Sequence, residues 1–385
     1  MGDNASSPSS PVPAMKRPHR AHPERIPATS FPKAVRRSVK SEVRMVPGVI
    51  KVDGRYLRFA VSDNENTVGP DGAGSPPVWA INIHGYFAGG GMYWRESSRL
   101  ADALGWRVIT PSLPGFGGSD SLPWGQVTME ALAEQVTAIT DHVGAGPAVV
   151  LGHSMGGAVA IQYAATHPES TLGLIYRDGI ATPAWRDRHG LFPTLLAPVA
   201  PDAAAFGDLM FSLLIDGPDL LVGRMTSTLR SVLPDARRNI RTIGRTLPVA
   251  SMLMDIDLRP QVAGIAERGD VPVLPIWGVF DRVVNRATAE EFEALSGAKV
   301  QWVPGGHSWM LGRPQGQSEV LRYLDAGLGF LEDVEARWRL LNQRPVAAAA
   351  KVKPKVKPKV KRKVKPKAKT KSGSGSGKRA LRTAS

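Results

Sequence analysis

Short apolar runs recur along this chain, and longer stretches with apolar residues at helical spacing separate most of them. Short apolar runs bounded by Gly, Pro or polar residues are typical of buried strands. We predict strands at residues 49–52, 55–61, 78–83, 107–110, 148–151, 172–176, 271–279 and 299–303. The first two flank Asp53 and Gly54, a dipeptide that tolerates the positive φ angles of a tight turn, so we expect a hairpin there.

Helical patterns fill the intervals between the later strands. We predict helices at residues 100–104, 127–143, 156–167, 288–295 and 318–341. Strands that alternate with helices form a mostly parallel sheet with both faces covered, which is an α/β architecture. Residues 181–268 break the alternation, because their helical segments are interrupted by prolines and contain no clear strand. We therefore predict a helical cap inserted after the sixth strand.

Charge separates the two ends of the chain from its middle. Residues 346–385 hold 12 Lys and 3 Arg and no acidic residue, a charge of +15, and residues 1–45 hold 9 basic and 3 acidic residues, a charge of +6. The residues between them hold 25 basic and 31 acidic groups, a charge of −6. We predict a disordered basic arm at 1–45, an α/β domain at 46–345 with its cap at about 181–268, and a disordered Lys/Pro-rich tail at 346–385.

Ser154 lies between a predicted strand and a predicted helix, in the sequence AVVLGHSMGG that ends at Gly157. A serine on a sharp strand-to-helix turn has a strained backbone, and the residues two positions away must be small. Gly152 and Gly156 meet this requirement and complete the G-x-S-x-G pattern of a nucleophile elbow. The alternative is a purely structural turn.

A serine nucleophile needs a base, an acidic group that orients the base, and donors for the oxyanion. Asp281 and His307 each follow a predicted strand, and the order Ser154, Asp281, His307 is the one that accompanies a nucleophile elbow. Asp178, after the preceding strand, is an alternative acid. His307 has the alternative of a surface loop histidine, and Asp281 that of a helix or turn cap.

Four motifs together resemble the α/β-hydrolase fold family: HGY from His84, GHSMGG around Ser154, FDRVV around Asp281 and GGHSW around His307. The resemblance covers roughly residues 46–341 and is to the capped, cofactor-independent branch of esterases, lipases and carbon-carbon bond hydrolases. It implies an α/β-hydrolase fold: a central, mostly parallel, eight-stranded sheet flanked by helices. One departure is Ser112, where relatives often have Asp.

The resemblance also implies a role for each residue. Ser154 would be the nucleophile, His307 the general base and acid, and Asp281 the group that fixes the imidazole tautomer. The backbone N–H groups of Tyr86 and Met155 would form the oxyanion hole.

Phe87, His84 and His153 also lie within or next to these motifs. If the loop after the third strand is shifted, Phe87 could supply the oxyanion donor instead of Tyr86. We expect His84 and His153 to be structural.

These roles predict a serine hydrolase that cleaves a carboxylic ester through an acyl-enzyme. Apolar cap residues could line an acyl pocket and favour a lipophilic substrate: Leu195, Leu196, Phe206, Met210, Phe211, Leu213, Leu214, Leu221 and 252–254. The alternatives are a carbon-carbon bond hydrolase, a cofactor-free haloperoxidase, or a non-catalytic scaffold. The resemblance also implies that haloalkane dehalogenases and epoxide hydrolases of this fold use an aspartate at the elbow, so the serine here disfavours those two chemistries. We expect no metal and no cofactor.

The basic tail suggests a second kind of partner. From Lys351 to Lys371 it alternates Lys with Val or Pro for most of its length, so like-charge repulsion and proline predict an extended polycation. It resembles the tails of linker histones and bacterial histone-like proteins, which implies nucleic acid or another polyanion as partner. An acidic membrane surface, or no dedicated partner, are the alternatives.

The cysteine count limits the possible chemistry, and the hydrophobic segments bear on the compartment. The chain contains no Cys, which excludes disulfides, thiolate metal sites and a cysteine nucleophile. It shows no apolar segment of a signal peptide and no apolar run as long as a membrane span. We expect a soluble, cytoplasmic protein without a transmembrane segment.

Overall fold

The computed structural model describes residues 42–185, 225–312 and 316–342. Their eight strands form one sheet in the order β1-β2-β4-β3-β5-β6-β7-β8. The strands are β1 (Met45–Val52), β2 (Arg55–Ser62), β3 (Trp79–Ile83), β4 (Arg107–Pro111), β5 (Ala148–His153), β6 (Thr171–Arg177), β7 (Val273–Gly278) and β8 (Gln301–Val303). β2 is antiparallel to β1 and β4, and all other neighbours are parallel. The predicted α/β-hydrolase fold is confirmed.

The predicted hairpin is present at the antiparallel edge. Asp53 and Gly54 adopt φ angles of 47° and 85°, and Val52 pairs with Arg55 directly across the turn. Positive φ at both central residues gives a turn whose twist matches that of the flanking strands.

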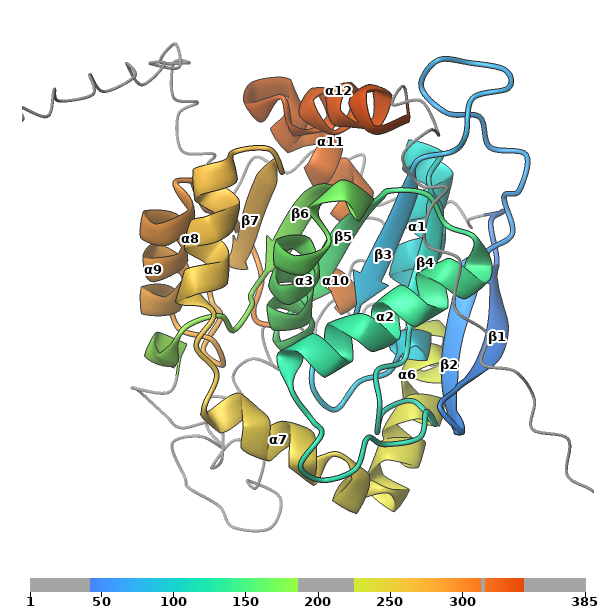
Figure 1. The fold of residues 1–385 in the computed structure, drawn as a ribbon, viewed down its shortest axis with the longest axis vertical. Coiled ribbons are helices and arrows are strands. Elements are labelled where there is room, and N and C mark those ends of the chain that lie inside the picture. Colours follow the sequence, from blue (N-terminus) through green and yellow to red (C-terminus); the bar gives the residue numbers. More distant parts are fainter. Residues whose placement is uncertain (1–41, 186–224, 313–315, 343–385) are drawn as a thin grey trace, which may run out of the picture. The chain divides into compact units, whose positions relative to one another are not determined.

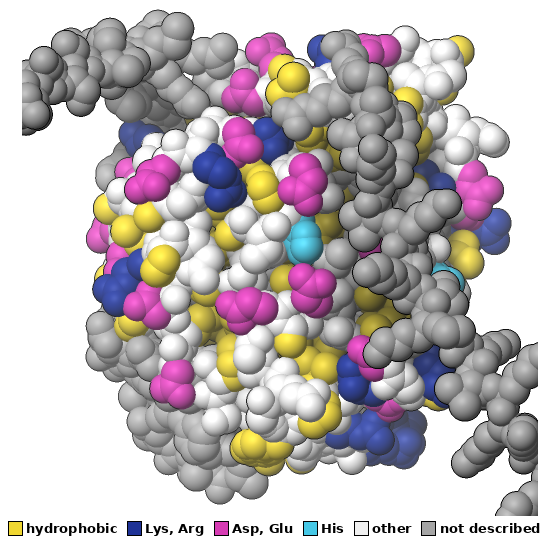
Figure 2. Space-filling view, viewed as in Figure 1, with side chains coloured by type: hydrophobic (Ala, Val, Ile, Leu, Met, Phe, Trp, Pro, Cys, Tyr) yellow, Lys and Arg dark blue, Asp and Glu magenta, His cyan; other side chains and the backbone are white. Residues whose placement is uncertain are grey.

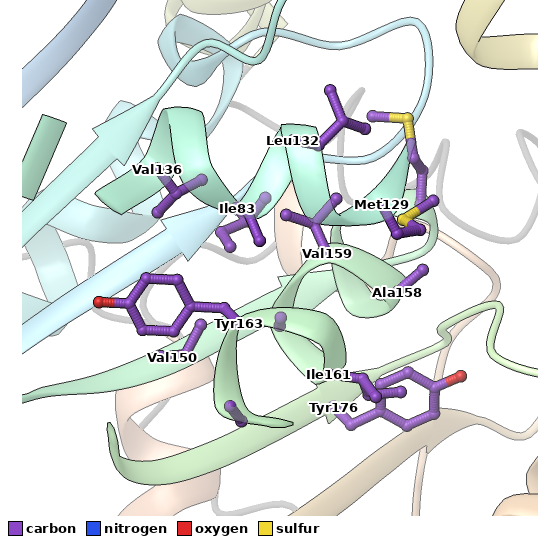
Figure 3. Packing of buried hydrophobic residues seen from close by; sticks show 14 of the residues in the cluster. Ile83, Met129, Leu132, Val136, Val150, Ala158, Val159, Ile161, Tyr163 and Tyr176 are labelled. Carbon is purple, nitrogen blue, oxygen red and sulfur yellow. The ribbon is translucent and has the colours of Figure 1, made fainter. Parts of the chain in front are cut away.

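Helices cover both faces of the sheet (Figure 1). One face carries α2 (Met129–Val143), α3 (Met155–Thr166), α8 (Arg259–Arg268) and α9 (Arg286–Ser296), and the other α1 (Trp94–Leu104), α11 (Gly316–Leu328) and α12 (Phe330–Asn342). Figure 3 shows Val150 of β5 next to Tyr163 of α3, and both belong to the core that also includes Val136 of α2. Val149 and Leu151, the neighbours of Val150, belong to the core on the opposite side. β5 is buried along its whole length, in keeping with the apolar run from Ala148 to Leu151 at its start.

The last predicted helix, at 318–341, is instead two helices. Gly329 has a φ of 68°, and its N–H donates to the Asp325 carbonyl at 2.9 Å. A glycine in the left-handed conformation is a common helix end, so α11 stops there and α12 begins at Phe330.

The interval between β6 and β7 contains the inserted helices. Its described elements are η4 (Pro183–Trp185), α6 (Met225–Arg241), η5 (Ile243–Arg245), α7 (Leu247–Met254) and α8. In Figure 1, α6 and α7 lie at the end of the sheet toward which the parallel strands point. α8 instead packs against α3 and α9, with Val262 and Ile265 in the same core as β5. The interval predicted as the cap, 181–268, therefore includes α8, which is one of the helices that cover the sheet.

Among the helices described, none is both long and apolar enough to cross a bilayer.

Candidate active site

Ser154 stands between the end of β5 and the start of α3 with φ 54° and ψ −122°. Its N–H donates to the Arg177 carbonyl at 3.1 Å, and its carbonyl accepts from the Gly157 N–H at 2.9 Å. Positive φ is unusual for a residue with a side chain and persists only where surrounding contacts impose it. The backbone at Ser154 is thus held in the strained geometry that the G-x-S-x-G pattern predicts.

The two flanking glycines are required by close backbone contacts. A Cβ at Gly152 would lie 2.2 Å from the Gly156 carbonyl oxygen, and one at Gly156 would lie 2.4 Å from the Ile83 carbonyl oxygen. Both distances are far below van der Waals contact. The end of β5, the first turn of α3 and the end of β3 therefore pack closely enough that neither position admits a side chain.

His307 is paired with Asp281. The His307 Nδ1 lies 2.9 Å from the Asp281 Oδ2, and the side chains are 12% and 1% exposed. The Asp281 Oδ1 accepts the N–H groups of Val283 and Val284 at 2.8 and 2.9 Å. These bonds fix the carboxylate, and a proton on Nδ1 facing it makes Nε2 the basic nitrogen of the neutral ring.

The structure also brings His307 to the elbow. The His153 Nε2 lies 2.8 Å from the His307 carbonyl oxygen, and the two imidazole centroids are 4.7 Å apart. Because Ser154 follows His153 directly, the predicted nucleophile and base come from the same corner of the sheet.

Asp178, the alternative acid, is buried beside Asp281 in a different arrangement. Its Oδ1 accepts the Gly278 N–H at 2.8 Å, and its Oδ2 accepts the Trp309 indole N–H at 2.7 Å. Burial, followed by the neighbouring Asp281 carboxylate, raises the pKa of Asp178 well above its usual range. The two Asp178 oxygens thus accept from Gly278 and Trp309, whereas the hydrogen bond to the imidazole is made by Asp281.

The predicted oxyanion donors border Ser154 on two sides. A Cβ at Gly85 would lie 3.3 Å from the Ser154 Cβ, so the loop that carries Tyr86 runs against the serine. Phe87, the alternative donor, has a φ of 64°. Met155 is the first residue of α3, and the first N–H groups of a helix have no acceptor within it.

His84 supports this loop from below, as predicted for a structural histidine. Its Nε2 accepts the Leu113 N–H at 2.9 Å, and its Nδ1 lies 2.8 Å from the Gly85 carbonyl oxygen. Burial lowers the pKa of His84 to about 4. The ring is therefore neutral at physiological pH, with its proton on Nδ1.

Tyr93 is a site residue that the sequence does not reveal. Its hydroxyl accepts the Gly85 N–H at 3.2 Å and lies 2.5 Å from the His153 Nδ1. Burial lowers the pKa of His153 well below its usual value, so the neutral ring accepts from Tyr93 and donates to the His307 carbonyl. This chain of bonds joins the Gly85 loop, the elbow and the His307 loop. No motif surrounds Tyr93, and only the tertiary structure shows its role.

The inserted helix α6 holds the same loop from the other side. The buried Asn239 amide donates to the Phe87 and Ala88 carbonyls at 2.9 and 2.8 Å and accepts the Gly117 N–H at 3.0 Å. Asp235 accepts the Met92 N–H at 3.2 Å. The described part of the insertion is thus fixed to the loops around Ser154.

The predicted acyl pocket falls largely outside the described residues, which exclude the apolar positions between 195 and 221. Of the remaining ones, Leu253 is buried and Met252 is half-buried against the core. Within the described ranges, no group of three or more His, Asp or Glu side chains is placed to hold a metal ion.

Comparison with known proteins identifies a family for the described domain. Residues 80–314 match the family described as alpha/beta hydrolase fold. A candidate non-heme haloperoxidase of Mycobacterium phage D29 is 28% identical over 252 residues, which cover 65% of this chain and 87% of that protein. Lipase LipV of Mycobacterium tuberculosis is 33% identical over 138 residues, 35% of this chain and 49% of the lipase. An esterase from Exiguobacterium antarcticum superposes with a TM-score of 0.52 at 19% identity, over 72% of this chain and 97% of the esterase.

Proposed function

Because this chain belongs to the α/β-hydrolase fold family, we propose that it is a serine hydrolase that cleaves a carboxylic ester of a lipophilic substrate. The observation that carries the proposal is the Asp281–His307 pair, 2.9 Å apart, beside a serine held at a φ of 54° on the elbow. A nucleophilic serine needs a base that is itself oriented by an acidic group, so a strained serine beside an Asp–His pair favours a nucleophile.

The proposed reaction proceeds in two steps. The Ser154 oxygen attacks the ester carbonyl while the His307 Nε2 takes its proton, and the N–H groups of Tyr86 and Met155 bind the developing oxyanion. The imidazolium then protonates the departing alcohol, which leaves an acyl-enzyme. Water attacks this ester with His307 again as base, and the carboxylic acid is released with Ser154 restored. Asp281 stabilises the imidazolium in both steps.

The ester substrate is favoured by the lipase relative and by the apolar sequence of the inserted segment. The phage relative favours a second candidate, a cofactor-free haloperoxidase. Both activities can share an acyl-enzyme, because hydrogen peroxide can replace water as the second nucleophile and release a peracid. A carbon-carbon bond hydrolase would use the same serine and histidine on a ketone.

A fluorophosphonate probe tests the nucleophile directly. We expect the purified chain to be labelled, and Ser154→Ala to remain unlabelled while its circular dichroism is unchanged. A series of p-nitrophenyl esters of rising acyl length would then give the preferred chain length. Absence of labelling in the folded wild-type chain would contradict the proposal and favour the non-catalytic scaffold.

The tail adds a proposed partner. The 15 positive charges of residues 346–385, without an acidic residue, support sequence-independent binding to nucleic acid or another polyanion through counterion release. The tail contains no aromatic residue, which disfavours recognition by base stacking. In this proposal the tail determines where the hydrolase acts.

A further inference from the structure

The outward side of α6 and the turn that follows it combine aliphatic and basic side chains. We call this surface the α6 face. It consists of Leu233, Arg237, Ile240, Arg241, Ile243, Arg245 and Leu247. Its aliphatic side chains are unusually exposed: Leu233 55%, Ile240 63%, Ile243 44% and Leu247 41%. Large aliphatic residues gathered on one surface indicate contact with an apolar partner.

Helical spacing explains why the four of these residues that belong to α6 share a side. Leu233, Arg237, Ile240 and Arg241 recur at intervals of four, three and one, which places them along one stripe of α6. Asp235 and Asn239 occupy the opposite stripe, where they are 3% and 0% exposed and bind the loop after β3. The buried polar contacts therefore fix the helix with its aliphatic residues facing outward.

Every charged residue of the α6 face is an arginine. Residues 225–254 contain five Arg and a single acidic residue, Asp235. That carboxylate is buried and paired with Arg238 at 2.9 Å. Arg245 lies 3.7 Å from Asp120, whereas Arg237 and Arg241 make no ion pair with any carboxylate of the described residues. The α6 face is thus complementary to a partner that is both anionic and apolar.

The position of the α6 face relates it to the candidate active site. The Tyr86 hydroxyl donates to the Thr246 carbonyl at 3.2 Å, which ties the turn after α6 to the loop beside Ser154. Figure 1 shows α6 and α7 at the end of the domain toward which β3 and β7 point. Figure 2, in the same orientation, shows basic side chains gathered at the lower right edge, with acidic side chains among them and hydrophobic ones beside them.

We propose that the α6 face docks on the surface of an anionic phospholipid bilayer. The aliphatic side chains would enter the boundary between head groups and acyl chains, and the arginines would bind lipid phosphates. A bilayer fits better than a nucleic acid, because exposed Leu and Ile gain nothing from a phosphate backbone. Docking needs no catalytic activity and therefore stands apart from the proposed serine chemistry.

The absence of cysteine allows a site-specific test. Ile240→Cys is labelled with an environment-sensitive fluorophore in the full-length chain and mixed with vesicles of phosphatidylcholine and phosphatidylglycerol. Leu340→Cys is the matched control, since Leu340 is 54% exposed and belongs to α12, a helix that lies far from α6 in Figure 1. We expect a blue shift at position 240 and none at position 340.

The control position separates docking by the α6 face from adsorption by the basic tail. If the tail alone binds the vesicles, both labels would sediment with lipid without a blue shift, and the proposal would be overturned. A shift at position 240 produced by duplex DNA instead of vesicles would also overturn it, in favour of a nucleic acid partner.

The arginines provide a second measurement. Each basic residue near an anionic bilayer contributes roughly fivefold to binding. Arg237→Gln with Arg241→Gln should therefore weaken vesicle affinity about 25-fold, while fluorophosphonate labelling of Ser154 stays at the wild-type rate. An unchanged affinity would show that these arginines do not face the lipid and would contradict the proposal. Loss of labelling in wild type with retained docking would instead contradict only the serine hydrolase.

Discussion

His84 couples the stability of the domain to pH through a single buried ring. Its pKa falls from 6.5 to about 4 on burial, so between these values the unfolded chain binds a proton that the folded chain does not. The stability that the neutral ring contributes is complete above pH 6.5 and is lost as pH falls toward 4. The expected loss from this group is about 3 kcal/mol in the free energy of unfolding.

Urea unfolding of wild type and His84→Gln at pH 7 and pH 4.5 measures this effect. Glutamine keeps an acceptor for the Leu113 N–H but has no titrating group, so we expect the variant to lose less stability between the two pH values. Equal losses in both proteins would mean that other groups carry the acid dependence.

Substitution of Asp281 and of Asp178 tests which of these two carboxyl groups orients His307. Asp281→Asn should lower kcat by about 10³- to 10⁴-fold, because an amide facing the His307 Nδ1 no longer imposes the catalytic tautomer. Asp178→Asn should leave kcat within a few-fold, since the His307 Nδ1 faces Asp281 while the Asp178 oxygens accept from Gly278 and Trp309. It should still destabilise the fold by about 1–3 kcal/mol, because the new NH₂ group cannot accept from Gly278 or Trp309 as an oxygen does.

Steady-state kinetics on one p-nitrophenyl ester and urea unfolding of both variants give the two quantities. The reverse pattern, with the larger kcat loss in Asp178→Asn, would assign the acid role to Asp178. The sequence leaves this choice open because both aspartates follow a strand, and only the contact of each carboxyl group distinguishes them.

At the scale of elements, the elbow depends on the contact of one strand, one helix and one loop. Gly156→Ala would place a Cβ 2.4 Å from the Ile83 carbonyl oxygen and 2.5 Å from that of His84. Neither backbone group can move without shifting β3 and its loop. We expect more than about 2 kcal/mol of destabilisation together with loss of fluorophosphonate labelling.

Gly264→Ala on α8 is the matched control for this substitution. A Cβ there meets only the Arg268 Nη1, at 3.9 Å, and alanine favours the helix by about 0.5–1 kcal/mol. Thermal unfolding should therefore show a small rise for Gly264→Ala and a large fall for Gly156→Ala. Similar midpoints for the two variants would mean that the elbow has room to relax.

Elements with a strong local pattern could be predicted from the sequence, and others could not. The β5 strand and the Asp53–Gly54 hairpin depend on nearby residues, and the structure has both. The break at Gly329 was missed because one glycine in a long amphipathic stretch weakens the helical pattern only slightly. Tyr93 and Asn239 were missed because their importance comes from hydrogen bonds to loops distant in the sequence.

At the scale of the whole molecule, the net positive charge of the chain resides in its last 40 residues. The total is +15, and residues 346–385 alone carry +15, so the rest of the chain has a net charge of zero. The tail and the α6 face would therefore bind anionic partners through different interactions. The tail would act by charge alone, whereas the α6 face would add aliphatic contact.

Salt separates these two modes of binding. Counterion release makes the affinity of a polycation for duplex DNA fall steeply with salt, by about 10³-fold or more between 50 and 200 mM when six or more phosphates are contacted. We expect the full-length chain to show this dependence, and a chain that ends at residue 345 to lose DNA binding while its esterase activity is unchanged. Ile240→Ser should leave DNA binding unaffected, since an aliphatic contact contributes nothing to phosphate recognition. If DNA binding survives removal of the tail, the polyanion site would be assigned to the folded domain. The arginines of the α6 face would then be the first residues to test.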